Sequence, residues 1–246
     1  MRLIQTKDYD AMSAYAADMV KQQIKVKEDT ILGLATGSSP IGIYEKLSEE
    51  YRNGNMSLAK VIGFNLDEYK SLSKKHKQSF YFFLIERLVK KTDFKTDNLN
   101  VLDGMSKDIE LECKKFDNRI HDVGGIDLQI LGIGRTGHIG FNEPADFFPD
   151  GSHCVKLEEE TIQSNSRFFD SLDEVPRYAL TMGIGTIMRA KKILMLVSGT
   201  SKAEILDQMI HGRVTPKIPA SILQFHPNVT VIADEAACSV INRRRL

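Results

Sequence analysis

The stretch "IDLQILGIGRTGHIGFNEPADFF", Ile126 to Phe148, contains the signals that decide the fold class and the position of the site. Its first half is a nearly continuous apolar run, typical of a strand covered on both faces. Three glycines then spell G-x-G-x-x-G from Gly132 to Gly137, the written form of a dinucleotide-binding loop. The loop continues into His138 and Glu143, so it could instead present titratable groups to a substrate.

The sequence around this motif argues against a dinucleotide loop. Pro144 lies seven residues after the third glycine, where a dinucleotide fold would continue a long helix. No strand is recognisable about twenty residues further on to supply the acidic residue that binds the ribose. The motif also follows about the fourth predicted strand, not the first. We therefore expect the loop to present His138 together with Glu143, a carboxylate that can hold the imidazole in one tautomer.

The rest of the chain alternates between strand-like and helix-like patterns. Apolar runs predict strands at Ile31–Ala35, Lys60–Leu66, Asn98–Asp103, Ile126–Ile133, Lys191–Ser198 and Asn228–Asp234. Helices are predicted between them, at Tyr9–Val26, Pro40–Arg52, Gln78–Lys91, Lys107–Val123, Pro176–Arg189 and Ser201–His211. This alternation predicts an α/β fold, an open, mostly parallel twisted sheet with helices on both faces, of the Rossmann-like kind.

One polar segment interrupts the alternation. The residues from Pro144 to Glu174 include "DFFPDGSH" and "EEETIQSNSRFFD" and fit a long excursion over the edge of the sheet. Such insertions in compact α/β domains are often lids or binding loops, so we predict a lid at about residues 144–175. Because no repeat, low-complexity tract or linker divides the chain, we expect residues 1–246 to form a single catalytic domain.

Composition excludes several classes of protein. The 246 residues carry a formal net charge of zero, which gives no electrostatic argument for a nucleic-acid or membrane partner. No apolar run has the length of a membrane span, and the first residues do not form a signal peptide. The three cysteines, Cys113, Cys154 and Cys238, are widely spaced and suit reduced thiols. We therefore expect a soluble cytoplasmic protein.

Two predicted strands end in turns that suit a phosphate group. In "ATGSSP" the hydroxyl residues precede a helix, with Ser39 as a candidate N-cap and Pro40 in the first turn. In "VSGTSKAEIL" Lys202 falls in the first turn of a helix, where a cation opposes the helix dipole unless an anion is near. A capped turn without ligand and a solvated lysine would give the same patterns, so either turn alone leaves both interpretations open.

A pair of carboxylates follows the second predicted strand. In "FNLDEY", Asp67 and Glu68 are adjacent, and adjacent strand residues point to opposite faces, so we expect only one of them to enter a site. A carboxylate at the carboxyl end of a parallel strand is a candidate general base.

Taken in order, "LGLATGSSP", "FNLDEY", "GHIGFNEP", "SNSRFF" and "SGTSKA" resemble glucosamine-6-phosphate deaminases of the aldose–ketose isomerising kind. The resemblance extends to "IPASILQFHPNVTVIADEAA" and so covers nearly the whole chain. It implies conversion of glucosamine 6-phosphate and water to fructose 6-phosphate and ammonia, a hydrolase reaction of amino-sugar metabolism and N-acetylglucosamine catabolism. It implies neither a metal nor an organic cofactor.

The resemblance also implies a role for particular residues. Asp67 matches the carboxylate that moves a proton between C2 and C1, His138 the imidazole that opens the pyranose ring, and Glu143 the carboxylate that supports it. The substrate phosphate would be bound by Gly37, Ser38, Ser39, Arg167 and Lys202. Because Arg167 lies in the polar excursion, we expect that segment to fold over bound substrate.

The chain departs from its relatives in two places. Thr136 stands where some family members carry an acidic residue beside the histidine, so we expect a less basic His138 in an active enzyme. The chain ends soon after the last predicted strand, whereas longer relatives are allosteric hexamers activated by N-acetylglucosamine 6-phosphate. We therefore do not expect that regulation, and the sequence leaves monomer and homo-oligomer open.

Two other functions fit part of the pattern. 6-Phosphogluconolactonases are similar in fold and in the phosphate loop, and such an enzyme would hydrolyse a lactone without releasing ammonia. A non-catalytic sugar-phosphate sensor would usually need an effector domain, for which this chain has no room.

Overall fold

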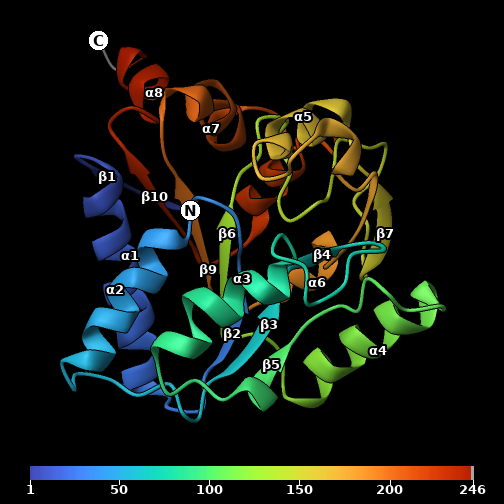
Figure 1. Ribbon diagram of the computed structural model, residues 1–246. Helices are drawn as coiled ribbons and strands as arrows, with labels where there is room; N and C mark the ends of the chain where they lie inside the picture. Colours follow the sequence, from blue (N-terminus) through green and yellow to red (C-terminus); the bar gives the residue numbers. More distant parts are fainter. Residues whose placement is uncertain (245–246) are drawn as a thin grey trace.

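The computed structural model describes residues 1–244 (Figure 1). Its strands are β1 Arg2–Thr6, β2 Ile31–Leu34, β3 Ile62–Asn65, β4 Asp67–Tyr69, β5 Leu99–Asn100, β6 Leu128–Gly132, β7 His153–Lys156, β8 Tyr178–Thr181, β9 Ile193–Val197 and β10 Val229–Asp234. Its α-helices are α1 Tyr9–Val26, α2 Ile41–Arg52, α3 Phe80–Arg87, α4 Ile109–Asp122, α5 Glu159–Ser166, α6 Ile184–Met188, α7 Ala203–His211 and α8 Ser239–Arg243. Five short 3₁₀ segments also occur in this part of the chain; the one that matters below is η4, Thr200–Lys202.

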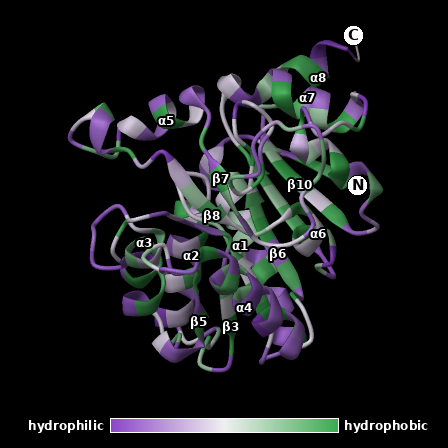
Figure 2. Cartoon of the chain, turned by 90° about the vertical axis from the view of Figure 1, so that its right-hand side faces the viewer, coloured by the Kyte–Doolittle hydropathy of each residue, from purple (hydrophilic) through white to green (hydrophobic). Residues whose placement is uncertain are grey.

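Seven strands form the central sheet in the order β1-β10-β9-β6-β2-β3-β5, and every adjacent pair is parallel. In Figure 1, α1 and α2 lie to one side of this sheet and α4 and α6 to the other. The predicted α/β class, with a mostly parallel sheet between helices, is confirmed. The interior is apolar: all five residues of β9 are buried, and Figure 2 shows β6 and β10 in the hydrophobic colour.

The strand order reverses direction at one point, and this point places the site. From β2 the chain moves to β3 and β5 at one edge, then returns to β6 on the other side of β2 and continues to β9 and β10. The carboxyl ends of β2 and β6 are therefore neighbours at a topological switch point. Open α/β sheets bind their ligands in the crevice outside such a point.

A second, antiparallel sheet borders this crevice, in the order β4-β8-β7. The chain leaves the central sheet after Asn65 and enters the second sheet at Asp67. The residue between them, Leu66, donates its N–H to the carbonyl of Leu34 (3.1 Å) and accepts from the N–H of Met182 (2.7 Å). These two bonds tie Asp67 to both sheets at once.

Three sequence-based expectations were wrong. The helix expected over Pro176–Arg189 is the strand β8 followed by the short helix α6, because the β8 backbone pairs with β4 and β7. No strand was expected about twenty residues after the glycine loop, but β7 lies there. It belongs to the antiparallel sheet and does not lie beside β6. Ser39 does not cap α2: Pro40 occupies the N-cap position, and no side chain caps this helix. Within residues 1–244 no helix is long and apolar enough to cross a membrane.

A buried carboxylate stabilises the amino-terminal edge of the sheet, opposite the crevice. Asp127 is 3% exposed and accepts hydrogen bonds from Lys27 Nζ (2.8 Å), Lys191 Nζ (2.7 Å) and the Ile31 N–H (2.8 Å). Burial works to raise the pKa of Asp127, but these cations and hydrogen bonds outweigh it and lower the pKa to about 2. The interactions are structural and distant from the crevice.

Candidate active site

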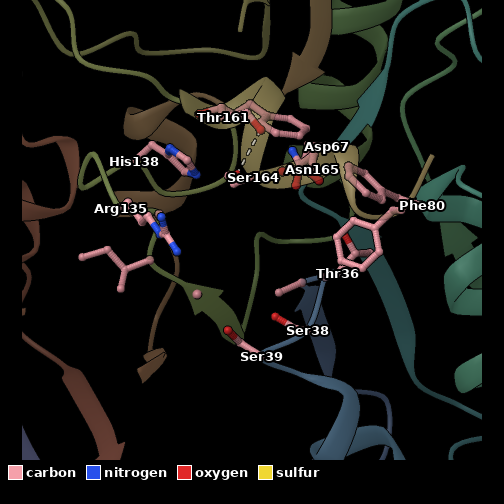
Figure 3. Close-up of a pocket in the computed structure, with 18 of the residues that line it drawn as sticks. Thr36, Ser38, Ser39, Asp67, Phe80, Arg135, His138, Thr161, Ser164 and Asn165 are labelled. Atoms are coloured by element: carbon pink, nitrogen blue, oxygen red, sulfur yellow. Dashed lines mark hydrogen bonds between the residues drawn. The ribbon is translucent and has the colours of Figure 1, made fainter. Parts of the chain in front are cut away.

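A cavity of about 940 Å³ opens at the switch point. Figure 3 shows Asp67 and His138 on opposite sides of it, with Ser38 and Ser39 at the carboxyl end of β2. Of the sequence-predicted site residues, the structure brings Gly37, Ser38, Ser39, Asp67, His138, Arg167 and Lys202 into the lining of this one cavity. The other two, Thr136 and Glu143, lie behind His138 and contact its ring.

Asp67 is the carboxylate that faces the cavity. It is 7% exposed, and within residues 1–244 no hydrogen bond or ion pair reaches its side chain. Burial, together with the charge of the adjacent Glu68, raises the pKa of Asp67 to about 8. A buried carboxylate of this kind is a strong proton acceptor when it is ionised, and its raised pKa lies near the pH at which enzymes work.

Glu68 points to the other face, as strand geometry requires. Its carboxylate accepts from the hydroxyl of Ser79 (2.9 Å) and from the N–H groups of Phe80 (3.1 Å) and Tyr81 (3.0 Å). It therefore satisfies donors at the start of α3 that have no partner inside the helix. The expectation that only one of the two carboxylates enters the site agrees with this arrangement.

His138 is held on its Nδ1 side by two oxygens. The Thr136 hydroxyl donates to Glu143 Oε2 (3.3 Å), so its oxygen is free to accept from His138 Nδ1 (2.9 Å), which also lies 3.1 Å from Oε2. Two acceptors at Nδ1 place the ring proton there and leave the Nε2 lone pair available. Burial would raise the pKa of Glu143, but the hydrogen bond and charge of His138 outweigh it and hold that pKa below its usual value.

One glycine of the motif makes room for this histidine. A β-carbon on Gly134 would lie 2.1 Å from His138 Nε2, so only glycine allows the imidazole to fold back over the loop. Gly137 has φ +83°, a backbone conformation that favours glycine. Two of the three glycines therefore have structural reasons that involve no pyrophosphate.

The lining of the cavity is also strongly cationic. Lys202, Arg135 and Arg167 all line it, and within the described residues none of the three forms an ion pair. Arg167 reaches from the end of α5 toward Ser38, with Nη2 3.5 Å from the hydroxyl. Burial, together with the charges of Arg135 and Arg167, lowers the pKa of Lys202 to about 8. Three unpaired cations beside the turn at the end of β2 make a site for a dianion.

Sequence reasoning missed several residues of the cavity. Arg135 occupies a variable position of the glycine motif, so the motif itself does not mark it as a site residue. Helix α5 contributes Ser164 and Asn165, which Figure 3 shows over the cavity near Asp67. The only available signal was the placement of polar residues around Arg167 in the excursion. An aromatic wall of Tyr69, Phe80, Phe141 and Phe169 completes one side and has no local sequence signature.

Comparisons with known proteins show the family of the chain. A family model described as glucosamine-6-phosphate isomerases/6-phosphogluconolactonase matches residues 6–232. Glucosamine-6-phosphate deaminases of Clostridium acetobutylicum and Thermoanaerobacter pseudethanolicus are each 49% identical over 241 residues, 98% of this chain and 100% and 95% of theirs.

Solved structures give the same result. A monomeric glucosamine-6-phosphate deaminase superimposes with a TM-score of 0.96 at 41% identity, covering 98% of this chain and 100% of that one. The 6-phosphogluconolactonase of Trypanosoma cruzi has a TM-score of 0.78 at 17% identity, covering 97% and 96%, and shares the fold. Because the family model matches most of the chain and relatives of 49% identity cover it almost from end to end, this chain belongs to the family of glucosamine-6-phosphate isomerases and 6-phosphogluconolactonases.

Proposed function

We propose that this chain is a glucosamine-6-phosphate deaminase, which converts glucosamine 6-phosphate and water to fructose 6-phosphate and ammonia. The observation that carries the proposal is that one cavity is lined by an unpaired buried carboxylate, an imidazole held on its far side by a second carboxylate, and three cations without ion-pair partners among the described residues. The relatives of 49% identity are named for this activity. Because water replaces the amine, the reaction is formally a hydrolysis.

The proposed reaction begins with ring opening. His138 Nε2 accepts the proton of the anomeric hydroxyl and returns a proton to the ring oxygen as the bond between C1 and that oxygen breaks. Thr136 and Glu143 keep the His138 imidazole oriented and stabilise the imidazolium that forms transiently. The phosphate, held by Ser38, Ser39 and the cations, orients the open chain in the cavity.

Proton transfer follows. Asp67 removes the proton from C2, which the neighbouring carbonyl makes acidic, and delivers it to C1. The carbonyl oxygen at C1 takes up a proton and becomes a hydroxyl, while the C2 amine gives up a proton and becomes an imine. Water then adds to this imine, and ammonia leaves as the C2 carbonyl forms. A carboxylate between the two carbons can serve both steps because the same proton travels only one bond along the chain.

Other features of the proposal concern the whole protein. We propose one catalytic domain in which α5, with Arg167, closes over bound substrate as a lid. Cys113 and Cys154 are thiols, which is consistent with a reducing compartment such as the cytoplasm.

The assay that tests the function uses purified protein and two substrates. With glucosamine 6-phosphate we expect ammonia and fructose 6-phosphate in equal amounts, and with 6-phosphogluconolactone no hydrolysis above the spontaneous rate. Lactone hydrolysis without ammonia release would identify the other activity named for the family, and phosphate-sugar binding without turnover would identify a sensor.

The pH dependence of kcat/KM should be a narrow bell centred near pH 8. Asp67 acts as a base only when ionised, so the rate rises as pH rises through its pKa of about 8. Lys202 attracts phosphate only when protonated, so the rate falls as pH rises through its pKa of about 8. Lys202→Arg keeps its charge at high pH, so this variant should lose the alkaline fall and keep the acid one. An alkaline limb unchanged in Lys202→Arg would show that another group causes it.

Thr136→Asp should move the pH profile of ring opening. A second carboxylate beside Nδ1 would favour the protonated imidazole, and we expect the acid limb to shift upward by about one pH unit. Thr136→Val is the matched control, because it removes the hydroxyl and adds no charge. The measurement is the rate of ring opening from pH 5 to 9 (about the range in which imidazoles titrate); identical profiles for wild type and Thr136→Asp would remove Thr136 from the account.

A further inference from the structure

A buried carboxylate outside the cavity is bonded to the turn that carries Lys202. Asp234, the last residue of β10, is 5% exposed. It accepts hydrogen bonds from the Ser198 hydroxyl, from the N–H of Gly199 (3.0 and 3.1 Å to its two oxygens) and from the N–H of Ala237 (2.7 Å). Within residues 1–244 it has no ion pair with a lysine, arginine or histidine. Both of its oxygens are therefore used by neutral donors.

One residue of the turn that Asp234 binds has a backbone conformation that is open mainly to glycine. Gly199 has φ +90° and ψ 153°, a combination that residues with a β-carbon rarely adopt. A β-carbon at this position would meet no atom within 4 Å, so the constraint comes from the backbone and not from crowding. Gly199 is the N-cap residue of η4, and its carbonyl accepts a hydrogen bond from the N–H of Lys202 (3.0 Å).

The Asp234 carboxylate carries a negative charge close to a site that we expect to bind an anion. Ser198, Ser201 and Lys202 line the cavity, whereas Asp234 does not. A negative charge behind a phosphate site weakens anion binding unless its field is taken up by local donors. Here four hydrogen bonds from the turn and the following segment take up both carboxylate oxygens.

We propose that Asp234 is a positioning residue that fixes the Ser198–Lys202 turn so that Lys202 is aimed at the substrate phosphate. The inference rests on the proposed function, because that function places the phosphate at this end of the cavity. Asp234 itself touches no substrate. Its loss should therefore weaken phosphate binding and leave the chemistry at Asp67 and His138 nearly unchanged.

The test measures binding of inorganic phosphate by calorimetry and, separately, kcat and KM for glucosamine 6-phosphate. For Asp234→Ala we expect both the phosphate affinity and 1/KM to fall about ten- to hundredfold, as for the loss of charged hydrogen bonds. The value of kcat should stay within about threefold, because the groups that make and break bonds are untouched. Asp234→Asn keeps an acceptor for the Gly199 N–H, so its phosphate affinity should fall less than that of Asp234→Ala.

Two further variants keep the inference testable if Asp234→Ala does not fold. Gly199→Ala disturbs the same turn through its backbone, so it should also weaken phosphate binding with kcat retained. Asp127→Asn is the matched control: it removes a buried, hydrogen-bonded carboxylate at the other edge of the sheet and should lower stability without changing phosphate affinity. The inference is overturned if the Asp234 and Gly199 variants bind phosphate as wild type does, or if Asp127→Asn weakens binding equally.

The same data separate this inference from the proposed function. If the wild-type protein binds phosphate but releases no ammonia from glucosamine 6-phosphate, the function is wrong and the phosphate measurements still decide the role of Asp234. If the wild-type protein binds no phosphate, both proposals are contradicted.

Discussion

Asp67→Asn should lower kcat by about 10²–10⁴-fold, the range that a positioned acid–base group contributes. Asparagine has nearly the same shape as aspartate but cannot accept a proton from carbon. Because the Asp67 carboxylate has no hydrogen-bond or ion-pair partner within the described residues, the substitution should leave the fold and the substrate affinity intact. The measurements are ammonia release and the exchange of the C2 proton of the substrate with deuterated solvent, which should also be lost.

Glu68→Gln is the matched control for this prediction. Glu68 is the adjacent buried carboxylate, and its oxygens are occupied by Ser79 and the first N–H groups of α3. We expect this variant to unfold at a lower temperature and to keep kcat within about threefold of wild type. Wild-type turnover in Asp67→Asn, or an equal loss in both variants, would contradict the assignment of the base.

His138→Gln should lower kcat by about 10²-fold or more, since ring opening then lacks its acid–base group. Glu143→Gln should cost less, because the imidazole remains and only its orientation and charge support are weakened. The geometry makes a sharper prediction for the double variant. If Glu143 acts only through His138, removing both should cost no more than removing His138 alone.

The measurement for this second prediction is kcat for the two single variants and the double variant under saturating substrate. Losses that multiply in the double variant would show that Glu143 contacts substrate independently of His138. That outcome would disagree with a carboxylate that lies behind the imidazole and outside the cavity lining.

The residues that follow the strands could be placed from sequence because local rules apply to them. A run such as "KVIGFN" ends where its apolar residues end, and the side chains beyond it lie at the carboxyl edge of a parallel sheet. Strand alternation separated Asp67 from Glu68, and the dipole argument made Lys202 a candidate anion ligand. The structure places Asp67 and Lys202 in the same cavity.

The structural features that could not be predicted from the sequence depend on contacts between segments that are far apart in the chain. Tyr178–Thr181 is a strand because β4 and β7 provide hydrogen bonds on both sides, and no local pattern marks that pairing. The edge strand β1 is partly exposed, so its sequence lacks a continuous apolar run. Arg135 enters the cation cluster only because β6 lies close to the η4 turn and the end of α5, which is a matter of topology.

The most direct measurement of the central claim is a crystal structure with an amino-alditol 6-phosphate, an open-chain substrate analogue that lacks a carbonyl and cannot react. We predict that its phosphate lies on Ser38, Ser39, Arg167 and Lys202, with C1 and C2 beside the Asp67 carboxylate and the C5 hydroxyl within hydrogen-bond distance of His138 Nε2. A bound analogue with its phosphate elsewhere, or with Asp67 and His138 not both in contact with the sugar, would contradict the account.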